Sequence, residues 1–356
     1  MCVRVLKTQK NKATEYHLGQ LKARLAKLRH QLMEGPKGSS SPGPGFAVEK
    51  TGDARISLIG FPSVGKSTFV SAVTNTESEA AAYEFTTLTC IGGILELEGA
   101  KIQLLDTPGI IEGAAQGKGR GREVIAVSRT ADVLLMMLDA ANGEKQRIKL
   151  TRELRTMGIR LNERPPNINF TKKTAGGIQY NKTVPVLSHL DEKMVRAICQ
   201  TYKIFHAQIL IREDATVDQF IDVVMGNCVY IPTIYCYNKI DNVSLERVDK
   251  LARLPHSVVV SCNLGWGMDV VLSKCWQYLN LCRIYTKRRG ELPSFGDPLI
   301  LRKGATVKTV CRTIHRDFED QLKYALVWGV SAKHSPQKVG VSHPISDEDV
   351  IQLVKK

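Results

Sequence analysis

The segment Gly60-Phe61-Pro62-Ser63-Val64-Gly65-Lys66-Ser67 lies between a short apolar run at residues 56–60 and a helical pattern that begins near residue 66. It matches G-x-x-x-x-G-K-[ST], a pattern in which glycines let backbone N–H groups approach phosphate oxygens. In such a loop the lysine contacts the β- and γ-phosphates of a nucleotide, and the hydroxyl ligates Mg²⁺. The sequence therefore predicts a phosphate-binding loop in which Lys66 and Ser67 take these two roles.

Outside this loop, strand-like and helix-like stretches alternate along the chain. Short apolar runs recur at residues 101–106, 133–139, 231–238 and 257–261, with helical patterns such as 144–157 and 268–280 between them. This alternation predicts an α/β fold, a P-loop domain with a parallel-rich central sheet that helices cover on both faces. Ligands of such sheets bind at the carboxyl ends of the strands.

A second motif, Asn238-Lys239-Ile240-Asp241, ends an apolar strand. A carboxylate at Asp241 can accept hydrogen bonds from the N1–H and 2-amino groups of guanine, which adenine does not have. Hydrogen bonds to a charged group contribute about 1.5–3 kcal/mol each, which is enough to favour GTP over ATP by orders of magnitude. We expect Asn238 and Lys239 to hold the phosphate loop and to stack on the base. In isolation these four residues could instead cap a helix, and ATP binding is a rival hypothesis.

Two shorter motifs follow other strands. Asp106-Thr107-Pro108-Gly109 is expected to hold Mg²⁺ through water at Asp106 and to meet the γ-phosphate with the Gly109 N–H, although the same pattern is also common in plain turns. Ser261-Cys262-Asn263 follows the last strand, and we expect one of its backbone N–H groups to meet the guanine O6.

The stretch Phe85-Thr86-Thr87-Leu88-Thr89 lies between the phosphate loop and Asp106. A threonine here is expected to complete the Mg²⁺ shell only when the γ-phosphate is present, as in an order–disorder switch. A threonine-rich β segment is the alternative.

The charge of the chain is concentrated at its two ends. The 356 residues carry a formal net charge of +15. Residues 1–50 hold 10 Lys and Arg against 3 Asp and Glu, residues 283–356 hold 14 against 8, and the middle of the chain holds 26 against 24. Basic flanks attract polyanions, nucleic acid above all, although a basic surface without any partner is the alternative.

The pattern of residues divides the chain into five segments. Leucines at 18, 21, 25, 28 and 32 predict one amphipathic helix within residues 8–33, and a Gly-, Pro- and Ser-rich linker follows it. Some 70 residues separate the helix at 144–157 from the next sheet strand, which indicates an inserted subdomain. We expect a basic helical region at 1–50, a nucleotide-binding domain at 51–163 and 228–284, an insertion at 164–227, and an α+β domain at 285–356.

Several classes of protein are disfavoured. No apolar run reaches the ~18 residues of a membrane span, and no signal peptide is visible. Nine cysteines without a C-x-x-C pair argue against a disulfide framework and a zinc ribbon. We therefore expect a cytoplasmic protein without a membrane partner.

Together these motifs resemble the Obg-related GTPases, and most closely the first eukaryotic branch of the developmentally regulated GTP-binding proteins. The resemblance spans nearly the whole chain and rests on TQKNKAT (8–14), LKARLAKL (21–28), GFPSVGKS (60–67), YEFTTLT (83–89), GIIEGA (109–114), GKGRGR (117–122) and YALVWG (324–329). It implies an N-terminal helix-turn-helix, a GTPase domain, an S5-like insertion and a C-terminal ubiquitin-like (β-grasp) TGS domain. It also implies GTP hydrolysis coupled to ribosome association and translation, a regulatory partner protein, and a Mg²⁺ ligand at Thr87.

Two departures from related enzymes concern catalysis. Ile110 follows Gly109 at the position where Ras-like enzymes carry the glutamine that orients water, so intrinsic turnover should be slow. With Lys66, Thr87 and Gly109 as the catalytic groups, the missing function would come from a partner, another group or K⁺. Ser63 stands where potassium-stimulated relatives often have asparagine, which weakens a K⁺ site but leaves it open. The alternative function is a nucleotide-gated scaffold for RNA or protein with negligible hydrolysis.

Overall fold

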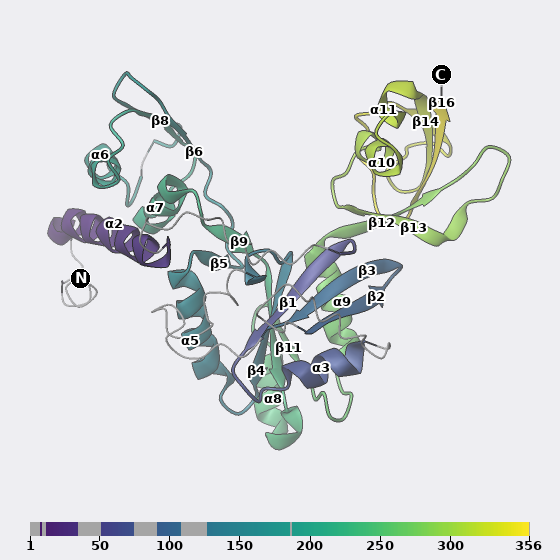
Figure 1. Ribbon diagram of the computed structural model, residues 1–356, viewed down its shortest axis with the longest axis horizontal. Coiled ribbons are helices and arrows are strands. Elements are labelled where there is room, and N and C mark those ends of the chain that lie inside the picture. Colours follow the sequence, from purple (N-terminus) through teal and green to yellow (C-terminus); the bar gives the residue numbers. More distant parts are fainter. Residues whose placement is uncertain are drawn as a thin grey trace. The chain divides into compact units, whose positions relative to one another are not determined.

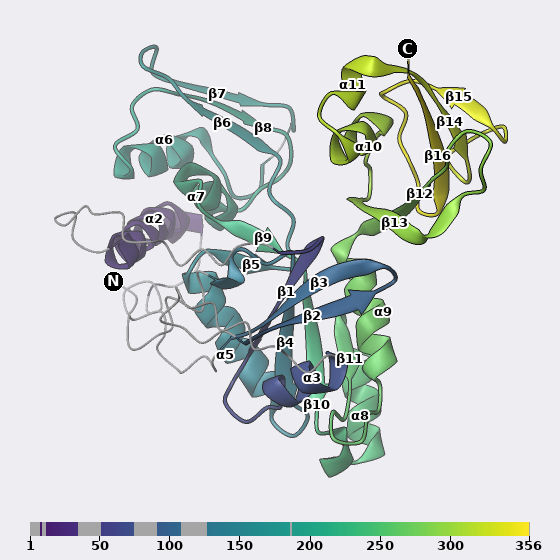
Figure 2. The same ribbon diagram turned by 45° about the vertical axis from the view of Figure 1, so that its right-hand side comes forward.

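The computed structural model describes residue 8 and residues 12–34, 51–74, 91–107, 127–185 and 187–355 (Figures 1 and 2). The chain separates into two compact units. One contains the N-terminal helix and the segment Lys149–Ile231; the other contains the nucleotide-binding motifs and the chain from Pro232 onward.

A six-stranded mixed sheet forms the centre of the second unit. Its strands lie in the order β11 (Ser257–Val259), β10 (Thr233–Asn238), β4 (Val133–Asp139), β1 (Ala54–Gly60), β3 (Ala100–Asp106) and β2 (Ile91–Leu97). All neighbours are parallel except β2 and β3, which form an antiparallel pair at one edge. The predicted P-loop α/β fold is therefore confirmed.

Burial explains why these strands are almost continuously apolar. Every residue of β1 is buried, because both faces of the strand are covered. On one face, α3 (Lys66–Val73) and α9 (Met268–Leu279) supply Phe69, Val70, Val271 and Cys275 to a single core with alternate residues of β1 and β4. Two further helices, α5 (Gly143–Thr156) and α8 (Leu245–Ala252), complete the α/β alternation.

The parallel register brings the predicted motifs to the same edge of the sheet. Gly60 pairs with Met137, Leu58 with Asp106, and Asn238 with Asp139. The carboxyl ends of β1, β3, β4 and β10 therefore meet, and the loops that follow them emerge side by side.

The C-terminal residues form a five-stranded sheet with one main helix packed on it. The order is β13 (Ser294–Arg302), β12 (Leu281–Thr286), β16 (Asp349–Lys355), β14 (Leu322–Trp328) and β15 (Gln337–Val339). The first and last strands, β12 and β16, pair in parallel at the centre, as in the predicted ubiquitin-like fold. The helical segment of this α+β domain is divided into α10 (Val307–Ile314) and α11 (Phe318–Gln321), because the backbone of His315 is extended.

The first unit contains a three-stranded sheet and two helices within the predicted insertion. Strands β6 (Ile168–Lys172) and β7 (Ile178–Lys182) flank β8 (Ala207–Ile211), and α6 (Glu192–Thr201) and α7 (Val217–Met225) pack on this sheet. Two short parallel strands, β5 (Ile159–Leu161) and β9 (Val229–Ile231), bracket it in the sequence.

The predicted N-terminal helix is α2 (Lys12–Glu34), which packs on the insertion. Leu18 and Leu21 of the leucine seam are buried, but Leu28 is exposed, and Ala23 is fully buried in its place. The rest of the expected helix-turn-helix lies outside the described residues. No helix in the described part of the chain is long and apolar enough to cross a membrane.

Candidate functional site

The phosphate-loop sequence connects β1 to α3 and leaves the start of the helix open. Gly65 is the N-cap residue in a left-handed conformation (φ 95°), which favours glycine, and no side chain caps this helix end. The first N–H groups of a helix have no partner inside it and attract anions. The local fold therefore creates an anion-binding helix terminus at residues 65–67.

The side chain of Lys66 folds back over the phosphate loop and bonds to its backbone. Its Nζ donates to the carbonyl oxygens of Gly60 (3.2 Å) and Phe61 (2.9 Å), and the residue is buried. Burial lowers the pKa of the Lys66 ammonium, while the Asp106 carboxylate acts in the opposite direction. A nucleotide phosphate near Nζ would supply a second negative charge to this partly desolvated cation.

Asn238 joins three of the predicted motifs. Its Nδ2 donates to the Val64 carbonyl oxygen (2.9 Å), and its Oδ1 accepts from the backbone N–H groups of Lys239 (2.8 Å) and Cys262 (3.0 Å). A Cβ at Gly65 would lie 2.3 Å from this Nδ2, so only glycine allows the loop to approach. The predicted contact between Asn238 and the phosphate loop is therefore present.

Lys239 also contacts the phosphate loop. Its Nζ donates to the Ser63 carbonyl oxygen (2.8 Å) and lies 3.6 Å from a carboxylate oxygen of Asp139. Asp139 was missed by the sequence analysis. The sequence feature that could have identified Asp139 is its position at the end of an apolar strand, the same position that Asp106 occupies in β3.

Asp241 lies in the short 3₁₀ helix η2 (Ile240–Asn242), where the Ser261 hydroxyl donates to its Oδ1 (2.7 Å). The Ser261 side chain therefore orients the carboxylate that we expect to recognise guanine. The hydrogen bonds of this motif limit which N–H of residues 261–263 can make the expected contact with the guanine O6. The N–H groups of Ser261 and Cys262 are occupied by the Trp266 carbonyl and Asn238, which leaves only the N–H of Asn263 available.

The predicted Mg²⁺ ligands Ser67 and Asp106 lie next to each other. The Ser67 hydroxyl donates to Asp106 Oδ2 (2.7 Å), whereas Asp106 Oδ1 is buried and has no hydrogen-bond partner among the described residues. Burial raises the pKa of Asp106, against the opposing effects of Ser67 and Lys66. A hydroxyl beside a carboxylate oxygen that has no partner fits a hard cation such as Mg²⁺, because such cations bind oxygen ligands. Thr107 follows Asp106, and its hydroxyl donates to the Leu58 carbonyl (2.5 Å), which fixes the end of β3.

Part of the predicted site lies outside the described residues. These positions are Phe85, Thr86, Thr87, Leu88, Thr89, Pro108, Gly109 and Ile110. Within the described residues, no cluster of histidine, cysteine and acidic side chains forms another metal site.

Comparison with known proteins identifies the family. The chain is 62% identical to human developmentally-regulated GTP-binding protein 2 over 352 residues, which cover 99% of this chain and 96% of the relative. It is 59% identical to the Dictyostelium discoideum homologue over 350 residues, or 98% and 96% of the two chains. The chain belongs to the developmentally regulated GTP-binding protein family.

Three family models match consecutive parts of the chain from residue 55 onward. Residues 55–172 match a model described as a 50S ribosome-binding GTPase, residues 175–281 match the C-terminal region of that domain, and residues 282–355 match a TGS domain. The chain is thus a GTP-binding protein with a GTPase domain and a TGS domain, and GTPases of this class generally use Mg²⁺.

The family expected from the sequence is confirmed, but its branch needs correction. The human, bovine and mouse relatives are all named protein 2, at 61–62% identity, whereas the sequence motifs had suggested the first branch. Among solved structures, the G domain of the T. maritima FeoB iron transporter aligns with 63% of this chain and 98% of its own length. Its identity is 16% and its TM-score 0.35, so this likeness carries no argument about function.

Asn238→Ala should lower both nucleotide affinity and stability. The substitution leaves the Val64 carbonyl and two N–H groups without their partner in a buried place, which costs about 2–3 kcal/mol of unfolding free energy. We expect nucleotide affinity to fall at least tenfold, measured by calorimetry with GDP. The exposed Asn242→Ala should change neither value; equal behaviour of the two variants would contradict the joining role of Asn238.

Asp241→Asn should remove the preference for guanine. Asparagine can keep the hydrogen bond from Ser261. Its amide cannot accept from both the N1–H and the 2-amino group of guanine as the carboxylate does, so GTP affinity should fall on the order of 100-fold. ATP affinity should stay unchanged, and XTP, which has an oxygen at C2, should bind better. Titrations with the three nucleotides test this, with the exposed Asp269→Asn as control. Unchanged selectivity would favour the ATP hypothesis.

Proposed function

We propose that this protein hydrolyses GTP slowly to GDP and phosphate and associates with the ribosome in its GTP-bound state during translation. The observation that carries the nucleotide part is the set of three hydrogen bonds made by Asn238. These bonds join the phosphate loop at Val64, the turn at Lys239 and the last motif at Cys262, which supports one nucleotide site at this edge of the sheet.

In this proposal each predicted site residue has a distinct role. Lys66 and the N–H groups of residues 60–67 neutralise the phosphates, while Asp241, Lys239 and the Asn263 N–H hold the base. Ser67, Thr87 and water held by Asp106 surround Mg²⁺. Gly109 meets the γ-phosphate. Phosphoryl transfer to water requires little beyond positioning and charge neutralisation, so this set supports slow hydrolysis.

Potassium is a candidate for the function that the absent glutamine would otherwise serve. Ser63 has a left-handed backbone (φ 61°), a conformation that asparagine adopts more readily than serine. The loop therefore already has the backbone shape that suits asparagine, the residue of potassium-stimulated relatives. We propose that Ser63 supports a weak K⁺ site.

Hydrolysis should be slow, dependent on Mg²⁺, and faster in K⁺ than in Na⁺. Phosphate release from GTP measured in the two salts tests this. Ser63→Asn should increase the ratio between the salts, and Asp106→Asn should lower the rate and shift its Mg²⁺ dependence to higher Mg²⁺ concentrations. A rate at background in both salts would refute the enzyme and leave the nucleotide-gated scaffold as the function.

The ribosome part of the proposal rests on charge and on the family. The model matched by residues 55–172 describes ribosome-binding GTPases, and the basic charge lies on the regions that flank the nucleotide site. We place ribosomal RNA against these flanks, and we include a regulatory partner protein, as the family resemblance implies.

The protein should sediment with ribosomes more strongly with a non-hydrolysable GTP analogue than with GDP. Binding should weaken steeply between 50 and 200 mM salt, because each phosphate contact releases counterions. Pelleting assays across a salt series measure both effects. Equal pelleting with the two nucleotides would remove the switch, and insensitivity to salt would remove the role of the basic flanks.

A further inference from the structure

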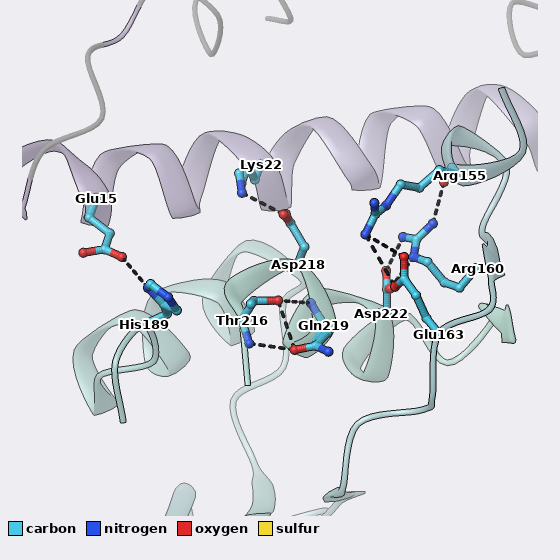
Figure 3. Close-up of polar contacts among 10 residues, drawn as sticks. All are labelled: Glu15, Lys22, Arg155, Arg160, Glu163, His189, Thr216, Asp218, Gln219 and Asp222. Carbon is cyan, nitrogen blue, oxygen red and sulfur yellow. Dashed lines mark hydrogen bonds and ion pairs between the residues drawn. The ribbon is translucent and has the colours of Figure 1, made fainter. Parts of the chain in front are cut away.

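One side of α2 is anchored to the insertion. A Cβ at Gly19 would lie 2.4 Å from Met194 Sδ, so the two helices α2 and α6 approach closely at this glycine. The Tyr202 hydroxyl donates to the Ala23 carbonyl (3.1 Å), and Lys22 forms an ion pair with Asp218 of α7 (2.8 Å). Figure 3 shows Lys22 pointing to Asp218. Helix α2 is thus part of the surface of the insertion.

Another side of α2 forms a groove with α6. Two adjoining hollows, of about 590 and 380 Å³, share Ala197 and Gln200 in their linings. We call them together the α2–α6 groove, defined by Tyr16, Gln20, Arg24, Lys27, Lys193 and Arg196. On α2 these side chains recur at steps of three and four residues, so they form one stripe along the helix.

Among the residues that the structure describes, the α2–α6 groove is lined by four cations and by no carboxylate. Arg24 and Lys193 are exposed, and neither side chain has a hydrogen bond or ion pair with the described residues. Lys27 donates to the Thr201 carbonyl, and Arg196 pairs with Glu192 on the exposed surface of α6. An exposed pair of this kind contributes little, so a phosphate can compete for Arg196.

The hollow between α2 and α7 differs in charge. It measures about 820 Å³ and contains four carboxylates, those of Glu15, Glu163, Asp218 and Asp222. These are held in ion pairs with His189, Arg155, Lys22 and Arg160 (Figure 3). Helix α2 therefore lies between two different hollows. In one, the four carboxylates are already paired with basic side chains. In the α2–α6 groove, Arg24 and Lys193 have no partner among the described residues.

Tyr16 adds an aromatic surface to this charge. The residue is 46% exposed, and its hydroxyl accepts a hydrogen bond from Gln20 Nε2 (3.2 Å), which limits the motion of the ring. An exposed ring beside cations is the combination that binds single-stranded nucleic acid, because the backbone meets the cations while a base stacks on the ring.

We propose that the α2–α6 groove binds single-stranded RNA, with phosphates at Arg24, Lys27 and Lys193 and a base stacked on Tyr16. This inference rests on the proposed ribosome association and names the surface and the chemistry of that contact. The unpaired base required by the ring favours a single-stranded segment or loop over a duplex.

The test compares two charge-reversal variants of the full chain. Arg24→Glu/Lys193→Glu changes the groove, and Lys172→Glu/Arg212→Glu makes the same change in net charge at exposed positions of the insertion outside the groove. Binding of a fluorescent 12-nucleotide poly(U) RNA is measured by anisotropy over a salt series. We expect at least tenfold weaker binding for the groove variant than for the control, and a salt slope smaller by about 1.4, as for two lost phosphate contacts.

Tyr16 provides an independent variant that leaves charge unchanged. Tyr16→Ala should weaken RNA binding about tenfold, whereas Tyr16→Phe, which keeps the ring, should bind as the wild type does. GTP hydrolysis and thermal unfolding should be unaffected in all variants, which shows that they are folded. Equal RNA binding by the groove and control variants, or by Tyr16→Ala and Tyr16→Phe, would overturn the proposal.

Ribosome pelleting distinguishes this failure from failure of the proposed function. If the wild type pellets and the groove variant both binds RNA and pellets normally, the ribosome contact lies elsewhere and only the groove assignment is wrong. If the groove variant keeps RNA binding but loses pelleting, the groove binds a ribosomal protein, and the RNA proposal is overturned. Parallel loss of RNA binding and pelleting supports both.

Discussion

The carboxamide of Asn238 is the contact on which the nucleotide site depends. It meets the phosphate loop at Val64, the turn at Lys239 and the last motif at Cys262, and the residue itself is only 3% exposed. An amide can donate and accept at the same time, and no other neutral side chain of this size except glutamine does so with the same planar geometry. In a buried place each lost partner costs more than the bond contributes, so the three loops are positioned together or not at all.

The same edge of the sheet carries two charged side chains whose ionised forms the protein alone stabilises poorly. Lys66 and Asp106 are both buried, and burial shifts the pKa of each toward its neutral form despite their mutual attraction. Asp106 Oδ1 has no hydrogen-bond partner, and the N-terminus of α3 has no side-chain cap. In the proposed function, a phosphate and a hard cation would satisfy these groups together. The folded protein without a ligand carries the free-energy cost of these buried, poorly paired groups. Binding of a metal-bound nucleotide would remove that cost, which favours this ligand over others.

The sheet and its motifs could be predicted because their signals are local. Apolar runs of strand length, a glycine-rich loop and polar residues at strand ends each lie within a few residues, and the parallel rule then places them at one edge. Contacts between loops could not be predicted in this way. One N–H of residues 261–263 was expected to face the base, but the sequence could not show that the Cys262 N–H already bonds to Asn238 from a different strand end. Asp139 became visible only through the register that pairs it with Asn238.

The N-terminal helix shows the same limit for packing. Its leucines at steps of three and four residues predicted one buried seam, yet Leu28 is exposed while Ala23 and Gly19 lie at the contact. Small residues allow helices to approach closely, so the buried side is decided by the shape of α6, which the sequence of α2 does not contain. The insertion sheet is a further case, since β8 enters between β6 and β7, which are earlier in the chain.

The position of α2 also changes the interpretation of the basic N-terminal region. Its cations were expected to act as a basic flank, a diffuse charge that attracts polyanions. On the folded insertion they are divided: Lys22 forms an ion pair with Asp218, whereas Arg24 and Lys193, some 170 residues apart in the chain, line the two adjoining hollows of the α2–α6 groove. If net charge alone attracted a polyanion, the polyanion would have no preferred position on the protein. Cations fixed by two packed helices instead have a defined spacing. A polyanion whose phosphates match this spacing binds there in a defined position.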